Sequence, residues 1–342
     1  MSRYLVQHAS PSGPGDSRPT ALQIIKDEDL VGKLAGKVIF ITGGNQGLGL
    51  ESARALYETG ATIYLGVRDV AKGQKAIDDI LSTASKPDPK SLFLIEMSLD
   101  SLNSVQAGAK AFLAQSSRLN ILLLNAGVMA TPEGRTKDGF ETQFGIDHVG
   151  HFLLFELLKP TLLASSTPEF NSRVVLLSSL AHRFNGPRYH DLNFDEEGSY
   201  DPMVAYGQAK TANLLMSNEI ERRYGGQGLH SLAVHPGIVG TNLGQYLDPS
   251  VMQSMAEDKK SFSLMKDVPQ GAATSVLAAV GREWEGRGGR YLADCAEQGP
   301  AKDGASPWDM SDQGYAPWGF DEESAKKLWD VSTKLVERWL AA

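Results

Sequence analysis

Short apolar runs alternate along the chain with longer segments in which apolar and polar positions recur at helical spacing. The runs of strand length cover residues 37–41, 62–67, 91–97, 120–124, 173–178, 229–235 and 289–292. This alternation predicts an α/β fold with a doubly wound parallel sheet of about seven strands and helices on both faces. Ligands bind such sheets beyond the carboxyl ends of the strands, so the side chains that follow the runs are the candidates for chemistry.

The segments outside this alternation suggest how the chain is organised. Residues 1–20 include a polar stretch rich in Pro, Ser and Gly, which predicts a flexible tail. We expect residues 21–342 to form a single domain, because 342 residues with 42% apolar content can bury one large core. Two long connections, residues 183–203 and 242–268, mix aromatic and apolar side chains with charges. Connections of this length are usually functional or disordered.

Composition excludes several classes of protein. The net charge is −8 and no basic cluster is present, which argues against nucleic-acid binding. The one cysteine, Cys295, cannot form an intramolecular disulfide and fits a reducing compartment. No stretch approaches the roughly 18 uninterrupted apolar residues of a membrane span, and the first residues do not resemble a signal peptide. These features predict a cytoplasmic protein that does not bind membranes.

The first chemical motif is the pair Tyr206 and Lys210, spaced Y-x-x-x-K. Side chains at i and i+4 of a helix project from the same face. An adjacent ammonium group stabilises a phenolate, so Lys210 is expected to lower the pKa of Tyr206 from its usual value of about 10. Tyr206 is therefore a candidate proton donor and acceptor.

The second motif is the glycine-rich segment 42–49, which follows the first apolar run and precedes a helical segment. Strand, glycine turn and helix form the context of a dinucleotide-binding fingerprint. Gly43, Gly47 and Gly49 permit positive φ and let the backbone approach a pyrophosphate, which then lies at the positive end of the helix dipole. The sequence thus predicts a Rossmann-type domain that binds a dinucleotide.

Together these motifs resemble the short-chain dehydrogenase/reductase family. The resemblance continues in family order with Leu124-Asn125-Ala126-Gly127, Ser178-Ser179 and His235-Pro236-Gly237, and it covers roughly residues 36–335. Gly207-Gln208, Asp191-Leu192-Asn193-Phe194 and Tyr291-Leu292-Ala293-Asp294-Cys295 are most similar to the retinol-dehydrogenase-like branch in its soluble microbial and fungal forms.

The resemblance implies roles for individual residues. Ser179 would bind the substrate oxygen, Tyr206 would exchange its proton, and Lys210 would hold the nicotinamide ribose. Ser178 competes for the serine role, but its spacing to the tyrosine fits the family pattern less well. The implied cofactor contacts are Gly43, Asn45, Gln46, Gly47, Leu48, Gly49, Arg68, Ser98, Leu99, Asn125, Ala126, Gly127, Tyr206, Lys210, Pro236, Gly237, Val239 and Thr241.

Arg68 bears on the choice of cofactor. It follows the second apolar run, where family members that prefer NAD usually present an acid to the adenosine ribose. A guanidinium there suits the 2′-phosphate of NADP(H), which we therefore expect as the cofactor. Asp69 complicates this interpretation, because it could cap a helix or accept a ribose hydroxyl.

Two positions depart from the family pattern. Asp147 stands where the family usually has the Asn that anchors a water molecule linking the lysine to solvent. A carboxylate has no amide donor, so the proton relay either persists with an altered pH dependence or is impaired. Ser98 replaces the Asp that commonly receives the adenine amino group, and a hydroxyl can still accept that hydrogen bond.

The sequence therefore favours an NADP(H)-dependent oxidoreductase acting on a carbonyl or alcohol of a fairly large apolar or aromatic metabolite, as in secondary metabolism. The alternative is a cofactor-binding protein with a regulatory or non-redox role, which only Asp147 favours. The resemblance places segments 183–203 and 242–268 beside the substrate as a hydrophobic wall and a mobile lid; the alternative for the second segment is a surface helix that packs on the core. It also implies a homodimer through the helix at 147–165 and the tyrosine helix; the alternative is that the C-terminal helix and its tryptophans cover that face. His148 and His151 are expected to be structural, with no metal site.

Overall fold

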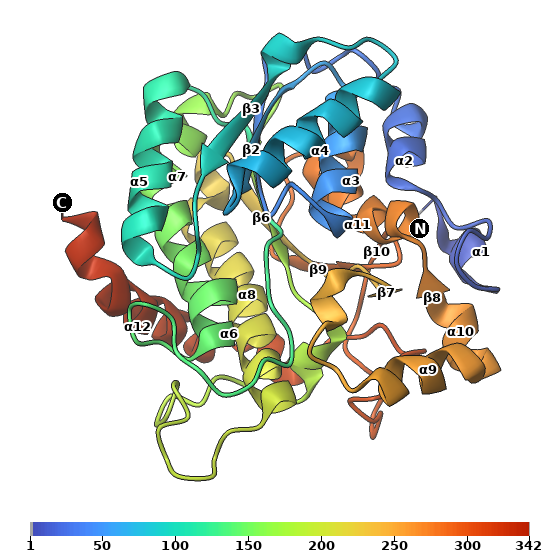
Figure 1. Ribbon diagram of the computed structural model, residues 1–342, viewed down its shortest axis with the longest axis vertical. Helices are drawn as coiled ribbons and strands as arrows, with labels where there is room; N and C mark the ends of the chain where they lie inside the picture. The colour runs from blue at the N-terminus through green and yellow to red at the C-terminus, as the bar shows by residue number, and fades with distance from the viewer. Residues whose placement is uncertain (1–2, 342) are drawn as a thin grey trace.

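The computed structural model describes residues 3–341 and has a twisted eight-stranded sheet at its centre (Figure 1). The strand order is β10-β9-β6-β5-β4-β1-β2-β3, and all pairs are parallel except β10 with β9. The strands are β1 (Val38–Thr42), β2 (Thr62–Val67), β3 (Leu92–Glu96), β4 (Ile121–Leu124), β5 (Ser172–Leu177), β6 (Leu229–Val234), β9 (Arg290–Ala293) and β10 (Ala296–Glu297). The chain reverses direction across the sheet between β1 and β4, which is where α/β sheets bind ligands.

The predicted α/β architecture is confirmed, and each of the predicted apolar runs forms one strand of this sheet. The eighth strand, β10, was not predicted because its two residues form an edge too short to produce an apolar run. A separate two-stranded sheet pairs β7 (Ile238–Val239) with β8 (Met265–Lys266) and was likewise too short to predict.

Helices cover both faces of the main sheet. They are α1 (Leu5–His8), α2 (Ala21–Asp27), α3 (Gly47–Tyr57), α4 (Val70–Thr83), α5 (Leu102–Gln115), α6 (Thr142–Phe144), α7 (Gly150–Ser165), α8 (Pro202–Tyr224), α9 (Pro249–Glu257), α10 (Lys259–Leu264), α11 (Val268–Val280) and α12 (Glu322–Leu340). One core packs α2, α3, α4 and α11 against the sheet, and the opposite core packs α5, α7 and α8 (Figure 1). The segment 242–268 is largely helical, because α9 and α10 lie within it.

The C-terminal helix α12 lies outside α7 and α8 (Figure 1). Trp329 packs edge-on against Phe152 and Phe155 of α7, and His148 shares a hydrogen bond of 2.8 Å with Ser332. The apolar stripe of α12 is therefore buried on the helices through which we expected two subunits to pair.

The N-terminal segment lies against the body of the fold, although its composition predicted a flexible tail. Tyr4 and Arg18 are 2% and 4% exposed. The guanidinium of Arg18 donates hydrogen bonds to main-chain carbonyls of residues 263–265. Composition could not predict this arrangement, because the acceptors are main-chain atoms distant in sequence.

Candidate active site

The glycine-rich turn joins β1 to α3 at the carboxyl edge of the sheet. Gly43 and Gly47 have φ of +67° and +53°, which a residue with a Cβ rarely adopts. A Cβ on Gly49 would lie 2.3 Å from the carbonyl oxygen of Gly43, so this glycine permits the close packing of helix on strand. No side chain caps the N-terminus of α3 at Gln46, and its N–H groups are therefore available to an anion.

Thr42 links the glycine turn to the segment that follows β4. Its hydroxyl accepts hydrogen bonds from the main-chain N–H groups of Asn125 and Ala126, at 2.9 and 3.0 Å. Its carbonyl accepts from the side chain of Asn125 at 2.9 Å. The same hydroxyl lies 2.9 Å from Nε2 of His151, whose Nδ1 contacts the carbonyl of Asp147 at 2.9 Å. Thr42 thus fixes three of the predicted site segments relative to one another.

The predicted catalytic side chains lie together between β5 and α8. Tyr206 and Lys210 are each 4% exposed, and the ammonium of Lys210 lies 5.3 Å from the centre of the tyrosine ring. The phenol of Tyr206 shares a hydrogen bond with the partly exposed hydroxyl of Ser179. Ser178 is buried, and its hydroxyl donates to the carbonyl of Lys210 at 2.8 Å. The two serines therefore differ in position: Ser178 fixes the helix, whereas Ser179 faces the phenol.

Asp147 contacts Lys210 directly. Oδ2 of Asp147 lies 2.8 Å from Nζ of Lys210, and Oδ1 accepts a hydrogen bond of 2.8 Å from the N–H of Val128. The carboxylate is fully buried and belongs to a π-helical turn, Gly145–Val149, between α6 and α7. Turns of this kind occur often at functional sites. At this position, then, a carboxylate is ion-paired to the lysine.

Burial dominates the electrostatics of this cluster. Burial raises the pKa of Tyr206 above its usual value, Lys210 and the hydroxyl of Ser179 oppose that change, and Asp147 adds to it. The ammonium of Lys210 lowers the pKa of Tyr206, as expected, but the loss of water outweighs this effect and the pKa is raised overall. Burial also raises the pKa of Asp147, against the pull of Lys210. For Lys210, burial favours the neutral amine, but Asp147 and Tyr206 outweigh it and raise the pKa.

The residues expected at the adenosine end follow β2 and β3. Arg68 is exposed directly after β2, and Ser98 is half-buried after β3. Leu99 is buried and packs against Gly150. Asp69 caps α4 by accepting a hydrogen bond of 3.0 Å from the N–H of Lys72. Asp69 could cap a helix or accept a ribose hydroxyl, and in the structure its side chain forms the helix cap.

The segment 236–241 approaches the glycine turn from the other half of the sheet. A Cβ on Gly47 would lie 3.6 Å from the methyl group of Thr241, and the side chain of Asn242 donates to Gln46 at 3.5 Å. Val239 packs against Gly271 of α11, which also adjoins Leu48. The structure therefore brings the predicted cofactor residues to one edge of the sheet.

These features fit a bound dinucleotide. The uncapped helix N-terminus and the positive-φ glycines suit a pyrophosphate. A Cβ on Gly127 would lie 3.0 Å from Asp147 and 3.2 Å from Lys210. Residue 127 must therefore lack a side chain to lie this close to the ion pair. A nicotinamide cofactor would supply the hydride, while the chain supplies binding and proton transfer.

Two residues that position Ser179 were not indicated by any sequence motif. His182 contacts the carbonyl of Ser179 through Nδ1 at 2.6 Å and accepts through Nε2 from the N–H of Ala316 at 3.0 Å. Arg183 donates to the carbonyls of Asp312 and Ser306 at 2.7 and 2.6 Å. These bonds tie the serine turn to the loop before α12. Their partners are main-chain atoms, so no sequence motif indicated them.

Residues 3–341 contain no group of three or more His, Cys, Asp and Glu side chains placed to hold a metal ion. His148 and His151 are buried and hydrogen-bonded within the core, and burial lowers the pKa of each to about 3. Among the described helices, none combines the length and apolar character needed to cross a bilayer.

Comparison with known proteins places the chain among enzymes. Residues 37–191 match the family model described as short chain dehydrogenase. The chain is 46% identical to "Short-chain dehydrogenase/reductase prx1" of Penicillium roqueforti over 98% of its own length and 95% of that protein. It is 36% identical to human "Retinol dehydrogenase 14", covering 89% of this chain and 88% of that one.

A similar solved structure is that of an uncharacterized protein from Mycobacterium paratuberculosis. It is 31% identical, has a TM-score of 0.65, and the match covers 91% of this chain and 97% of the other. The suggested relation to fungal proteins and to retinol dehydrogenases is confirmed by the Penicillium and human relatives. The chain belongs to the short-chain dehydrogenase/reductase family and is an oxidoreductase that acts on small molecules with a nicotinamide cofactor.

Proposed function

We propose that the chain is an NADP(H)-dependent carbonyl reductase or alcohol dehydrogenase of secondary metabolism, acting on a fairly large apolar or aromatic metabolite. The observation that carries the proposal is the grouping of the partly exposed Ser179 with the buried Tyr206 and Lys210. A protein that only bound the cofactor would not require all three side chains.

In the direction of carbonyl reduction, Ser179 would orient the substrate oxygen and Tyr206 would donate the proton to it. The raised pKa of Tyr206 keeps the phenol protonated at neutral pH, which suits a proton donor. Lys210 would hold the nicotinamide ribose and favour the phenolate left after transfer. In alcohol oxidation the same proton moves in reverse.

NADP(H) is proposed because Arg68 is exposed after β2 while Asp69 is engaged as the cap of α4. Arg68→Ala should weaken NADPH binding by roughly 10- to 100-fold, the range expected when hydrogen bonds to a charged group are lost. NADH binding should change little. Fluorescence titration checks both, with Lys75→Ala, an exposed cation of the following helix α4, as the control. Equal losses for both cofactors would rule out the assignment to the 2′-phosphate.

The segments 183–203 and 242–268 are proposed to form the wall and the lid of the substrate site. Tyr246 in the second segment is 48% exposed, as expected of a side chain available to an apolar ligand. In the first segment, Tyr200 donates a hydrogen bond of 2.9 Å to the carbonyl of Thr131, which connects the wall to the chain after β4.

Asp147 is proposed to tune the proton chemistry through Lys210. Asp147→Asn removes a charge that raises the pKa of Tyr206, so the pH dependence of turnover should move to lower pH. Oxidation requires the phenolate and should reach half its maximum at a lower pH, and reduction, which requires the phenol, should decline at a lower pH. Initial rates across a pH series check this. An unchanged profile would show that the carboxylate does not influence Tyr206.

A cofactor-binding protein with a regulatory or non-redox role is the second candidate, and the direct contact of Asp147 with Lys210 favours it. NADPH consumption, measured beside NADPH binding, distinguishes the two functions. NADPH consumption is followed with a panel of large apolar and aromatic carbonyl compounds, and binding is measured in parallel. Turnover supports the reductase. Tight NADPH binding with no consumption across the panel would favour the second candidate.

We also propose that the protein is cytoplasmic and monomeric. The homodimer implied by the family would use α7 and α8, but α12 packs on them through Trp329. Light scattering at micromolar concentration should give a molar mass near 36.9 kDa. Twice that mass would show that two subunits associate in spite of α12.

A further inference from the structure

Residues 4–18, here called the N-terminal strap, lie against residues 262–270, which are about 250 positions away in the sequence. The strap contains α1 and passes beside α10, β8 and α11 (Figure 1). A Cβ on Gly13 would lie 2.7 Å from the ring of Phe262, so the strap packs directly against the lid segment 242–268.

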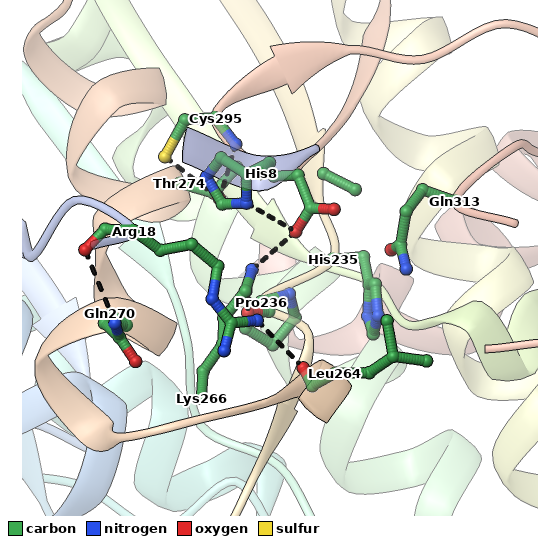
Figure 2. Close-up of polar contacts among 12 residues, drawn as sticks. His8, Arg18, His235, Pro236, Leu264, Lys266, Gln270, Thr274, Cys295 and Gln313 are labelled. Carbon is green, nitrogen blue, oxygen red and sulfur yellow. Dashed lines mark hydrogen bonds and ion pairs between the residues drawn. The ribbon is translucent and has the colours of Figure 1, made fainter. Parts of the chain in front are cut away.

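Arg18 is the centre of this contact. Its side chain is 3% exposed, and its guanidinium donates to the carbonyl of Leu264 at 3.0 Å (Figure 2). It also donates to the carbonyls of Ser263 and Met265. These carbonyls end α10 and begin β8, where a helix leaves acceptors without partners inside the helix. Asp16 fixes the guanidinium by accepting from Nε at 2.8 Å. Arg18 therefore caps the C-terminal end of the lid.

The strap also holds the helix that follows the lid. Gln270 stands in the first turn of α11, where it forms a capping box with Asp267. Its amide donates to the carbonyl and carboxylate of Asp16 at 3.1 and 3.0 Å, and its oxygen accepts from the N–H of Gly15 at 3.0 Å. The strap therefore holds the chain on both sides of β8: Arg18 bonds the chain where β8 begins, and Asp16 and Gly15 bond Gln270 after it.

From β8 the contacts continue to the cofactor segment. β8 pairs with β7, which lies within residues 236–241. Lys266 of β8 is 3% exposed and donates to the carbonyl of Pro236 at 3.2 Å. Its ammonium lies 2.7 Å from Oδ1 of Asp294, and His8 of the strap lies 3.3 Å from the same oxygen (Figure 2).

A cavity of about 240 Å³ lies between the strap and this segment. His8, Pro11 and Arg18 line it on one side, and Gly237 and Ile238 line it on another. Residues of the strap and of the segment that the family resemblance assigns to the nicotinamide thus line the same cavity.

We propose that the N-terminal strap is part of the active site and that Arg18 is its positioning residue. Arg18 fixes the root of the lid and, through β8 and β7, the segment that contacts the nicotinamide. This inference rests on the proposed function. Ser179, Tyr206 and Lys210 lie on other elements, so the strap acts on binding and not on the chemical step.

The test compares Arg18→Met with the wild type well below the melting temperature of both proteins. If only about one-tenth of the variant molecules hold the lid root correctly, the Kd for NADPH and the KM for the carbonyl substrate rise about tenfold, while kcat changes little. Trypsin should cleave after the exposed Lys259 and Lys260 of α10 faster in the variant than in the wild type. Added NADPH should slow this cleavage less in the variant than in the wild type. Mass spectrometry identifies these cleavages.

Arg3→Ala is the matched control, because Arg3 precedes the strap, is 57% exposed, and contacts Tyr4, Asp27 and Glu28 rather than the lid segment. It should match the wild type. Arg18→Lys, which keeps the charge but cannot reach the same set of carbonyls, should rescue binding partly. If Arg18→Met does not fold, Asp16→Asn provides a milder change in the same direction.

Arg18 and Asp16 variants that behave like Arg3→Ala in NADPH affinity and in cleavage would overturn the inference. A fall in kcat with unchanged KM would also overturn it. NADPH binding and cleavage do not require turnover, so a wild type that binds NADPH without consuming it would contradict the proposed function and still leave the strap testable.

Discussion

Tyr206→Phe should lower kcat by roughly 10²- to 10⁴-fold, which is the usual contribution of a positioned acid–base group. The substitution removes the hydroxyl hydrogen-bonded to Ser179 and leaves the ring under the ammonium of Lys210. Because the ring remains in the core, NADPH affinity and melting temperature should change little. Steady-state rates with NADPH and a reactive carbonyl compound measure the effect.

The matched control is Tyr224→Phe at the far end of α8. The hydroxyl of Tyr224 accepts a hydrogen bond of 3.2 Å from Lys159, remote from the glycine-rich turn. This variant should keep wild-type turnover. Near-normal activity of Tyr206→Phe would remove the phenol from the mechanism and transfer the proton to another group.

The second large effect is expected for Lys210→Met, which should damage turnover, cofactor binding and stability together. Lys210 is the cation 2.8 Å from the fully buried carboxylate of Asp147. Removing one partner of a buried ion pair typically costs about 3–5 kcal/mol of the free energy of unfolding, because the other charge stays buried. Urea unfolding measures this cost, and fluorescence titration measures the expected loss of NADPH affinity.

The double variant Asp147→Asn with Lys210→Met separates stability from catalysis. It leaves no isolated charge, so part of the lost free energy of unfolding should return while turnover stays low. If Lys210→Met alone is as stable as the wild type, the ion pair contributes nothing to folding. An unchanged NADPH affinity of Lys210→Met would refute the proposed contact of Lys210 with the ribose.

The strands were predictable because parallel strands buried on both faces appear in the sequence as continuous apolar runs. β7, β8 and β10 have two residues each, too few to produce a pattern, and were missed. The N-terminal strap was missed for another reason. Its composition is typical of a tail, but Arg18 is buried by carbonyls about 245 positions away.

The sequence was enough to predict which candidate side chains lie together, but not their electrostatics. The spacing of Tyr206 and Lys210 indicates a shared helix face, and the structure places the ammonium 5.3 Å from the ring centre. The sequence could not indicate that burial would outweigh the cation and raise the pKa of Tyr206. Nor could it indicate that a π-helical turn would bring Asp147 into direct contact with Lys210.

We propose that this chain reduces a carbonyl group with NADPH through proton transfer at Tyr206. Turnover with NADPH deuterated at the transferring position of the nicotinamide, followed by mass analysis of the alcohol product, tests this directly. We expect one deuterium on the carbinol carbon with the wild type, and a rate roughly 10²- to 10⁴-fold lower with Tyr206→Phe. An alcohol without deuterium, or equal rates for the two proteins, would contradict it.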